Sequence, residues 1–276
     1  MTHIPIVLFG KDGMLGSALV EILKKKQELF AFSKKELDIT DKKSVFRTIR
    51  EIKPVYVINA AAYTKVDDCE KNKKQATDVN AQAVKHLALA CKKYKSTLIH
   101  YSTDYVFNGL NPMGYKENEL RDPINSYGIS KAMGEEFIEK IHPQYCIIRT
   151  SWLFGRNGTN FVDTILHYSS KKSEISVVCD QKGCPTYTLD LARKTAIMLN
   201  GEYCGIFHIT NSGSCTWSEF AEEIVKIKKV NTKIIHITSN ELKRYAKRPQ
   251  YSILKNTKTQ PLRNWKEALK DYLKNE

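Results

Sequence analysis

Two kinds of apolar pattern alternate along the first half of the chain. Residues 4–9 form a short, continuous apolar run that is rich in β-branched members and stops at a glycine. Such a run predicts a strand that is buried on both faces of a parallel sheet. The next segment repeats apolar residues every three or four positions before it reaches a lysine run, which predicts a helix over residues 14–23.

The same alternation continues as far as Thr150. Further strands are expected at residues 29–32, 55–59, 97–101 and 145–149. Helices are expected around 76–94, at 127–141, and in a segment that Thr40 caps and that ends at residue 52. Strands that alternate with helices of this length predict right-handed crossovers and helices on both faces of one sheet. The predicted fold class is therefore α/β, with a doubly wound parallel sheet of the Rossmann type.

Beyond Thr150 the pattern loosens, and glycines and Pro185 separate shorter elements. Thr216 and Glu219 form a capping-box pattern for a helix over 218–228, and residues 234–237 read as a short strand. We therefore expect a dinucleotide-binding domain over residues 1–150. Residues 151–276 should form mainly a smaller C-terminal α/β lobe that binds substrate, with some segments returning to the first domain.

The charge of the chain is strongly positive. Its 44 lysine and arginine residues outnumber 30 acidic residues, and the formal net charge is +14. Such an excess is typical of nucleic-acid-binding proteins and of enzymes that act on polyanionic small molecules. Here the lysines are scattered over the polar faces of predicted helices, without a basic arm or interleaved stacking aromatics. The distribution favours a solvated surface and argues against a nucleic-acid partner.

Other composition features exclude several classes. The sequence has no apolar run of the about 18 residues that a membrane span needs, and the N-terminal apolar stretch lacks a cleavage-like site. We therefore expect a cytoplasmic protein with no membrane partner. The seven cysteines include no CxxC pair, which argues for reduced thiols. The seven histidines have no HExxH or similar spacing, so no metal site is predicted.

A glycine loop separates the first predicted strand from the first predicted helix. Glycines there permit a tight turn and close approach of the backbone to a pyrophosphate, and the helix N-terminus favours the anion. We expect a nicotinamide dinucleotide on this loop, bound by Gly10, Asp12, Gly13, Met14, Leu15 and Gly16. Glycine also ends strands for purely conformational reasons, so the prediction depends on the place of the loop at the start of the full alternation.

The end of the second predicted strand bears on which dinucleotide is bound. NAD-selective sites commonly carry an acid there for the ribose 2′-hydroxyl, whereas this chain reads Ser33-Lys34-Lys35. Lysines favour a 2′-phosphate, so we expect Ser33 and Lys34 to bind NADPH. NADH is the alternative, if the lysines are ordinary surface residues.

Two further segments are candidates for cofactor contacts. Asp38 and Ile39 would flank the adenine, with Asp38 accepting a hydrogen bond from its amine; a structural acid before a helix is the alternative. Ala60, Ala61 and Ala62 end the third strand in small residues. Small residues suit close passage of the cofactor, although tight helix packing would also explain them.

Tyr127 and Lys131 are four positions apart in one predicted helix and therefore share a face. Reduction of a ketone by hydride leaves an alkoxide that must gain a proton, and a tyrosine donates well only when a nearby positive charge lowers its pKa from about 10. Lys131 would supply that charge and bind the nicotinamide ribose. Thr103, at the end of the fourth strand, would hydrogen-bond the carbonyl, with Ser102 as the alternative on chemistry alone. The pair could instead be two exposed residues of a surface helix, but its place after that strand favours a site.

At these residues the chain resembles the extended short-chain dehydrogenases/reductases and, within them, the family of dTDP-4-dehydrorhamnose reductases. The similarity covers nearly the whole length, including the glycine loop, the Tyr127/Lys131 pair and segments 59–67, 100–107, 149–152, 180–186 and 248–254. The resemblance implies catalytic positions for Thr103, Tyr127 and Lys131. It implies sugar contacts for Asp104, Tyr105 and Trp152, a place near the cofactor for Thr64, and a diphosphate contact for Arg248.

The activity that the resemblance implies is NADPH-dependent reduction of the 4-keto group of dTDP-4-dehydro-L-rhamnose to dTDP-L-rhamnose. One alternative is a reductase of another nucleotide-linked 4-keto-6-deoxy sugar. Another is a non-catalytic NADP-binding regulatory subunit of the methionine adenosyltransferase type, against which the intact Thr103, Tyr127 and Lys131 argue.

The first helix departs from one pattern of this family. Some relatives form a magnesium-bridged dimer through a glutamate early in that helix, where this chain reads Ser17-Ala18-Leu19. The departure argues against that metal and that dimer. A monomer and a homodimer both stay open.

Overall fold

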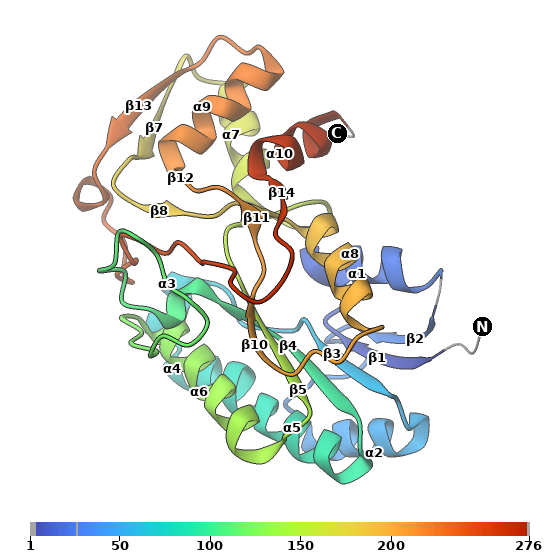
Figure 1. Cartoon of the computed structure of the whole chain (residues 1–276). Helices are drawn as coiled ribbons and strands as arrows, with labels where there is room; N and C mark the ends of the chain where they lie inside the picture. The colour runs from blue at the N-terminus through green and yellow to red at the C-terminus, as the bar shows by residue number, and fades with distance from the viewer. Residues whose placement is uncertain (1–3, 26, 275–276) are drawn as a thin grey trace.

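A six-stranded parallel sheet forms the centre of the computed structural model, which describes residues 4–25 and 27–274. Its strand order is β10-β5-β4-β3-β1-β2, and each neighbouring pair is parallel. The strands are β1 (Pro5–Phe9), β2 (Glu28–Phe32), β3 (Tyr56–Asn59), β4 (Thr97–Thr103), β5 (Tyr145–Thr150) and β10 (Gly205–His208). The predicted doubly wound α/β fold is confirmed (Figure 1).

Helices cover both faces of this sheet, which explains why its strands are continuously apolar. Ile6 and Leu8 of β1 face α1 (Met14–Leu23) and α8 (Thr188–Met198). Val7 and Phe9 face the opposite layer, built from α2 (Lys42–Ile52), α5 (Ala83–Tyr94) and α6 (Ser126–Ile141). In Figure 1, α1 and α8 lie together on one side of the strands, and α2, α5 and α6 lie on the other.

Strand β1 lies where the strand order reverses, because it pairs with β2 on one side and with β3 on the other. Ligands of doubly wound sheets bind at such a reversal, beyond the carboxyl ends of the strands. The loop from β1 to α1, the end of β3 and the end of β4 therefore all contribute to one edge of the sheet.

Two predicted elements differ in detail. The N-cap of α2 is Asp41 and not Thr40, because the Asp41 carboxylate accepts hydrogen bonds from the amides of Lys43 and Ser44. The predicted helix around 76–94 is three segments in sequence, α4 (Lys73–Thr77), a π-helical turn η1 (Asp78–Gln82) and α5. The π turn directs Asn80 towards Tyr63 and Ser130, which a regular helical period does not predict.

Part of the chain after Thr150 returns to the central sheet. Helix α8 packs on α1 and β10 extends the sheet beside β5. The sequence pattern did not identify these two elements or α7 and α10. The boundary between residues 150 and 151 stays a prediction.

The rest of that part forms a smaller α/β lobe with its own apolar core. Helices α7 (Phe161–Ser169), α9 (Trp217–Lys228) and α10 (Trp265–Lys274) pack beside the parallel pair β7 (Glu174–Val178) and β13 (Lys233–Ile237). The predicted capping box of Thr216 and Glu219 is confirmed at the start of α9.

Short elements complete the chain. They are α3 (Val66–Lys71), η2 (Asp104–Val106), β6 (Leu153–Phe154), β8 (Lys182–Gly183), β9 (Thr186–Tyr187), β11 (Asn211–Ser212), β12 (Cys215–Thr216), η3 (Ser239–Glu241) and β14 (Leu262–Asn264). None of the helices in the described ranges combines the length and apolar character that a bilayer crossing requires.

A buried ion pair joins β5 to α6. Arg149 is 1% exposed and Glu135 is fully buried. The Arg149 guanidinium donates from Nε to Glu135 Oε1 at 3.0 Å and from Nη2 to Oε2 at 2.7 Å, and Arg121 donates to the same carboxylate at 3.0 Å. Removing one partner of such a pair leaves a buried charge without full compensation.

The substitution Arg149→Met should therefore lower the free energy of unfolding by about 3–5 kcal/mol. The measurement is urea denaturation followed by circular dichroism. The matched control is Arg50→Met, because Arg50 pairs with Glu51 at 3.4 Å with both side chains exposed, and such a pair contributes about 0–1 kcal/mol. Equal losses in the two variants would contradict the assignment of Arg149 as a buried structural cation.

Candidate active site

The glycine loop is shaped by two close backbone approaches. Gly10 has φ of +87°, and a Cβ there would collide with the backbone of Ala60 and Ala61. A Cβ at Gly16 would collide with the carbonyl of Gly10. The Gly10 amide also donates to Phe32 O at 2.9 Å. Glycine is therefore required at these two positions for β1, β2, β3 and α1 to meet.

The N-terminus of α1 is suited to an anion. Its N-cap is Gly13, which provides no side-chain hydrogen bond to the first amides of the helix. Those N–H groups and the helix dipole point towards the loop, where a pyrophosphate would bind. Residues at this edge therefore fit a dinucleotide.

A cavity of about 310 Å³ begins at this loop, and we call it the dinucleotide cavity. Nine predicted cofactor residues line it: Gly10, Asp12, Gly13, Lys34, Asp38, Ile39, Ala60, Ala61 and Ala62. Four further lining residues, Leu37, Tyr63, Gln75 and Val79, were not predicted. These four residues follow no motif, because folding alone brings together the turn before α2, the end of β3, α4 and η1.

Other predicted cofactor residues lie outside the lining of this cavity. Leu15 joins the apolar core and Thr64 is exposed. Ser33 is buried, and its hydroxyl accepts a hydrogen bond from the Glu36 amide at 3.3 Å. Met14 lines a different cavity, between α1 and α8. Their cofactor roles stay predictions.

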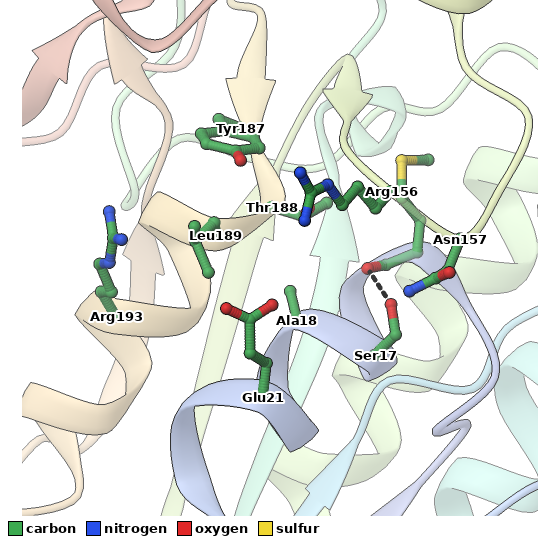
Figure 2. A pocket seen from close by; sticks show the side chains of 10 residues that line it. Ser17, Ala18, Glu21, Arg156, Asn157, Tyr187, Thr188, Leu189 and Arg193 are labelled. Carbon is green, nitrogen blue, oxygen red and sulfur yellow. Dashed lines mark hydrogen bonds between the residues drawn. The ribbon is translucent and has the colours of Figure 1, made fainter. Parts of the chain in front are cut away.

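The cavity between α1 and α8 has a volume of about 240 Å³ (Figure 2). Glu21 points into it from α1, one turn after Ser17, and Arg156 reaches it from the loop after β6. The Ser17 hydroxyl donates to the Met14 carbonyl at 3.1 Å. Across the described ranges, no three His, Cys, Asp or Glu side chains are arranged to hold a metal ion.

The predicted catalytic residues come together between β4 and α6. Thr103 ends β4, Tyr127 lies in the first turn of α6, and Lys131 follows one turn later. All three are buried or partly buried. Asn125 starts α6 by accepting a hydrogen bond from the Gly128 amide at 2.8 Å.

Two more contacts fix the start of α6. The Glu70 carboxylate accepts hydrogen bonds from the amide and the hydroxyl of Ser126, both at 2.7 Å. Gly128 lies against the Tyr105 carbonyl, where a Cβ would collide. The Tyr105 ring then packs edge-on to Tyr127, with ring centroids 5.8 Å apart. The position of the Tyr127 phenol is thus set by segments far apart in the sequence.

Burial dominates the electrostatics of this group. It raises the pKa of Tyr127, and the hydrogen bond with the Thr103 hydroxyl opposes that shift. Burial also lowers the pKa of Lys131 to about 8, against the opposing effect of the Glu135 carboxylate. The pKa of Asp104 rises to about 6 for the same reason. The site therefore holds three groups whose protonation burial has shifted towards the neutral form.

Lys131 has two partners that the sequence did not indicate. Its Nζ donates to the Tyr101 carbonyl at 2.6 Å and lies 3.1 Å from His100 Nε2. His100 Nδ1 in turn lies 3.1 Å from Asn59 Nδ2. Asn59 and His100 are register partners on β3 and β4. Both are inward-facing polar residues in otherwise apolar strands, which is the signal that could have identified them.

The predicted substrate residues have varied surroundings. The Thr103 hydroxyl donates to Asp104 Oδ1 at 2.9 Å, so it must change partner to bind a carbonyl. Trp152 stacks on Trp217 with ring centroids 3.5 Å apart. Arg248 donates from both Nη atoms to the Asp67 carboxylate at 2.6 Å. A diphosphate would have to compete with Asp67, so that contact stays a prediction.

Known proteins share the sequence and the fold of this chain over nearly its whole length. Residues 4–276 match the family model described as the RmlD substrate binding domain. The chain belongs to the RmlD family. The resemblance and the fold class predicted from the sequence are thereby confirmed.

Individual RmlD relatives match over nearly their full length. The spore coat polysaccharide biosynthesis protein SpsK of Bacillus subtilis is 40% identical, covering 97% of this chain and 96% of its own. A dTDP-4-dehydrorhamnose reductase of Aggregatibacter actinomycetemcomitans is 38% identical, covering 96% and 97%. The crystal structure of dTDP-4-dehydrorhamnose reductase from Bacillus anthracis in complex with NADP has a TM-score of 0.97 at 37% identity and covers 100% of both chains.

Two glycine substitutions distinguish packing from ligand contact in this RmlD chain. Gly16→Ala should destabilise the fold by about 1–3 kcal/mol, because the added Cβ collides with the Gly10 carbonyl. Gly13→Ala should leave the melting temperature nearly unchanged, since Gly13 has φ of −74° and its Cβ would contact only Gly10 O, at 3.4 Å.

The methyl group that Gly13→Ala adds would instead lie at the lining of the dinucleotide cavity. We expect Gly13→Ala to weaken NADPH binding by about tenfold or more, equivalent to about 1.4 kcal/mol. Thermal denaturation and fluorescence titration with NADPH measure the two effects. Tight NADPH binding by a stable Gly13→Ala variant would place the pyrophosphate elsewhere.

Proposed function

We propose that this chain is the NADPH-dependent reductase that converts the 4-keto group of dTDP-4-dehydro-L-rhamnose to the alcohol of dTDP-L-rhamnose. The carrying observation is the meeting of Thr103, Tyr127 and Lys131 between β4 and α6, at the sheet edge that holds the dinucleotide cavity. At the coarser level the chain is a reductase of dTDP-linked 4-keto sugars of the RmlD family.

The chain provides the proton chemistry of the reduction. A bound nicotinamide would supply the hydride that reaches the carbonyl carbon. Tyr127 donates its phenolic proton to the developing alkoxide, and Thr103 donates a hydrogen bond to the same oxygen after it leaves Asp104. In its ammonium form, Lys131, on the same face of α6, would support the phenolate with its charge. Burial of these groups excludes water from the reacting carbonyl.

Cofactor preference rests on Lys34. It lines the dinucleotide cavity, and its Nζ lies 3.9 Å from the Asp38 carboxylate in an exposed pair. An exposed pair at this distance is weak, so a 2′-phosphate could recruit the lysine at little cost. The Asp38 Oδ1 is engaged with the amide and hydroxyl of Thr40 at 2.9 and 2.8 Å, which holds the adenine end of the cavity in shape.

A second, basic cavity of about 720 Å³ lies beside the site and fits the nucleotide diphosphate. Lys243, Arg244, Lys247 and Arg248 contribute to its lining. Arg244 and Arg248 act on the pKa of Tyr105 through their charges, so this cavity reaches the residue that packs on Tyr127. Converging cations suit a diphosphate with two negative charges.

A sister activity is the main alternative. Relatives of 33–36% identity are named as a reductase of dTDP-4-keto-6-deoxy-D-glucose and a probable ketoreductase of another dTDP-linked sugar. Both names describe reductases, but with sugars other than dTDP-4-dehydro-L-rhamnose. Membership in the RmlD family and the intact Thr103, Tyr127 and Lys131 both argue against the regulatory NADP-binding subunit that the sequence had left as an alternative.

The discriminating assay couples this chain to dTDP-glucose, the upstream dehydratase and epimerase, and NADPH. We expect NADPH oxidation that depends on both upstream enzymes and a product with rhamnose stereochemistry at C4 by NMR. A product of talose or fucose type would assign the sister activity. No oxidation with any dTDP-linked 4-keto sugar would favour the regulatory class.

Tyr127→Phe tests the mechanism in the same assay. It removes only the donor oxygen, so kcat should fall by about 10² to 10⁴ while NADPH affinity stays near that of the wild type. The control is Tyr168→Phe, an exposed tyrosine on α7, which should retain full turnover. Near-normal turnover by Tyr127→Phe would exclude this phenol as the proton donor.

Lys34→Ala tests the cofactor preference. KM for NADPH should rise by about tenfold, equivalent to loss of about 1.4 kcal/mol of binding, while KM for NADH should hardly change. Steady-state kinetics with both cofactors measure the effect, and Lys24→Ala, an exposed lysine at the end of α1, is the control. If the wild type used NADH as well as NADPH, the preference itself would be wrong.

A further inference from the structure

The three-residue chain of Asn59, His100 and Lys131 has a defined hydrogen-bond direction. All three side chains are buried, at 1%, 0% and 2% exposure. The direction begins at Asn59, whose Oδ1 lies 3.1 Å from the backbone amide of Ala61. A backbone N–H can only donate, so it fixes which end of the Asn59 amide is oxygen. The Nδ2 group must then face His100.

This orientation selects the tautomer of His100. Nδ2 of an amide only donates, so His100 Nδ1, 3.1 Å away, must accept and must lack a proton. Complete burial by itself lowers the pKa of His100 well below its usual range, which excludes the imidazolium. The single proton of the neutral ring is therefore on Nε2.

The consequence reaches Lys131. The Nε2–H group of His100 is directed at Lys131 Nζ, 3.1 Å away, and only a neutral amine has a lone pair that can accept it. The same Nζ still donates to the Tyr101 carbonyl at 2.6 Å. An ammonium here would place one N–H against another.

We propose that Asn59 and His100 are positioning residues that make Lys131 a hydrogen-bond acceptor and so favour its neutral amine over its ammonium. Protonation of Lys131 would require the histidine to change tautomer and the Asn59 amide to turn against the Ala61 N–H. The protonation of Lys131 would then depend on Asn59 and His100, two polar residues that contact neither the substrate nor the hydride.

Among the residues that the structure describes, few charged groups act on the hydrogen-bonded series of Asn59, His100 and Lys131. Glu135 of α6, one turn after Lys131, favours the ammonium. Its carboxylate is shared by Arg149 of β5 and Arg121, which reduces that influence. The charge that acts on His100 is Lys131 itself. The direction of the hydrogen bonds therefore adds to burial in lowering the proton affinity of Lys131.

The consequence for catalysis rests on the proposed reductase function. When Tyr127 gives its proton to the alkoxide, the resulting phenolate must regain one. If Lys131 is the source, its ammonium loses one proton, the phenolate gains it, and the amine that remains is the species that His100 Nε2–H stabilises. The pair Asn59–His100 would thus make Lys131 a better proton donor near neutral pH.

The decisive measurement is the tautomer of His100 in the wild-type protein. Long-range ¹⁵N–¹H correlation spectra of protein labelled with ¹⁵N-histidine separate N–H from lone-pair nitrogens, and the loss of one signal set in His100→Phe assigns His100. We expect the Nε2–H tautomer between about pH 6 and 8. An Nδ1–H tautomer or an imidazolium would overturn the proposal, and this measurement requires no variant other than the one for assignment.

Asn59→Asp should reverse the chain. A carboxylate only accepts, so His100 should change to the Nδ1–H tautomer in the same spectra. Because this variant also adds a negative charge, the titration of Lys131 is measured in His100→Phe instead. An unchanged Nε2–H tautomer in Asn59→Asp would overturn the role of Asn59.

Loss of the His100 ring should shift the titration midpoint of Lys131 in opposite directions, depending on whether Nε2 donates to Nζ or accepts from it. The ¹³Cε resonance of Lys131, assigned with Lys131→Met, reports its titration. Removing the donor in His100→Phe should raise the titration midpoint by about one pH unit, a tenfold change in proton affinity. A lower or unchanged midpoint would overturn the proposal, because loss of an acceptor would favour the amine.

A matched control uses another buried histidine. His142, which follows α6, contacts the Ser96 carbonyl through Nε2 at 2.8 Å, just before β4 begins and therefore at the opposite end of that strand from Thr103. His142→Gln should leave the His100 tautomer and the Lys131 titration unchanged, and an equal shift would show a non-specific effect and overturn the proposal. Failure of the proposed sugar reduction would leave these spectra unaltered, so the two failures are distinguishable.

Discussion

The hydrogen bond from Lys131 Nζ to the Tyr101 carbonyl connects α6 to the interior of β4 at 2.6 Å. A lysine that is 2% exposed is tolerated only where its nitrogen has partners. Here the partners are a strand carbonyl and His100, so the helix with Tyr127 has one position relative to the strand that ends in Thr103. This buried attachment is the contact that joins the middle of α6 directly to the strand of the site.

The start of α6 is held by residues from distant segments, which explains how the site stays in register with the lobe. Asn125 caps the helix and also donates to the Lys247 carbonyl at 2.9 Å. Glu70 of α3 holds Ser126, and Asp67 of the same helix holds Arg248. A displacement of the 244–250 segment, which also lines the basic cavity, would therefore be felt at Tyr127. Through α3, the segment that lines the basic cavity is attached to the helix that carries Tyr127.

The buried ion pair of Glu135 and Arg149 is a second attachment of α6, one turn after Lys131. Glu135 and Arg149 attach α6 to β5, and Arg149 also approaches His208 of β10 at 3.4 Å. The ion pair is stabilised by its hydrogen bonds but is costly to desolvate, so its net contribution to stability is small while its loss is damaging. Its clearest effect is to fix where α6 lies across two neighbouring strands, β5 and β10.

Much of the fold was determined by the sequence itself. Residues 4–9 and the glycine loop predicted β1 and its crossover to α1, because burial on both faces of a sheet forces continuous apolar runs and a tight turn forces glycine. The Tyr127/Lys131 pair was visible for a similar reason, since helical period places the two on one face. Thr216 and Glu219 predicted the start of α9 because a capping box is a purely local interaction.

The remainder was decided only by tertiary structure. β10 carries no strong signal of its own, and it becomes a strand because β5 offers an open edge. Asn59 and His100 were invisible as partners of Lys131 because they lie on separate strands, and their hydrogen bonds exist only once β3, β4 and α6 are packed. Arg248 was predicted to contact a diphosphate, and only the fold shows that Asp67 reaches it across most of the chain. The hydrophobic period of a helix or strand and the steric limits of the backbone depend on residues close in sequence. The pairing of buried polar groups depends on which distant segments the core brings together.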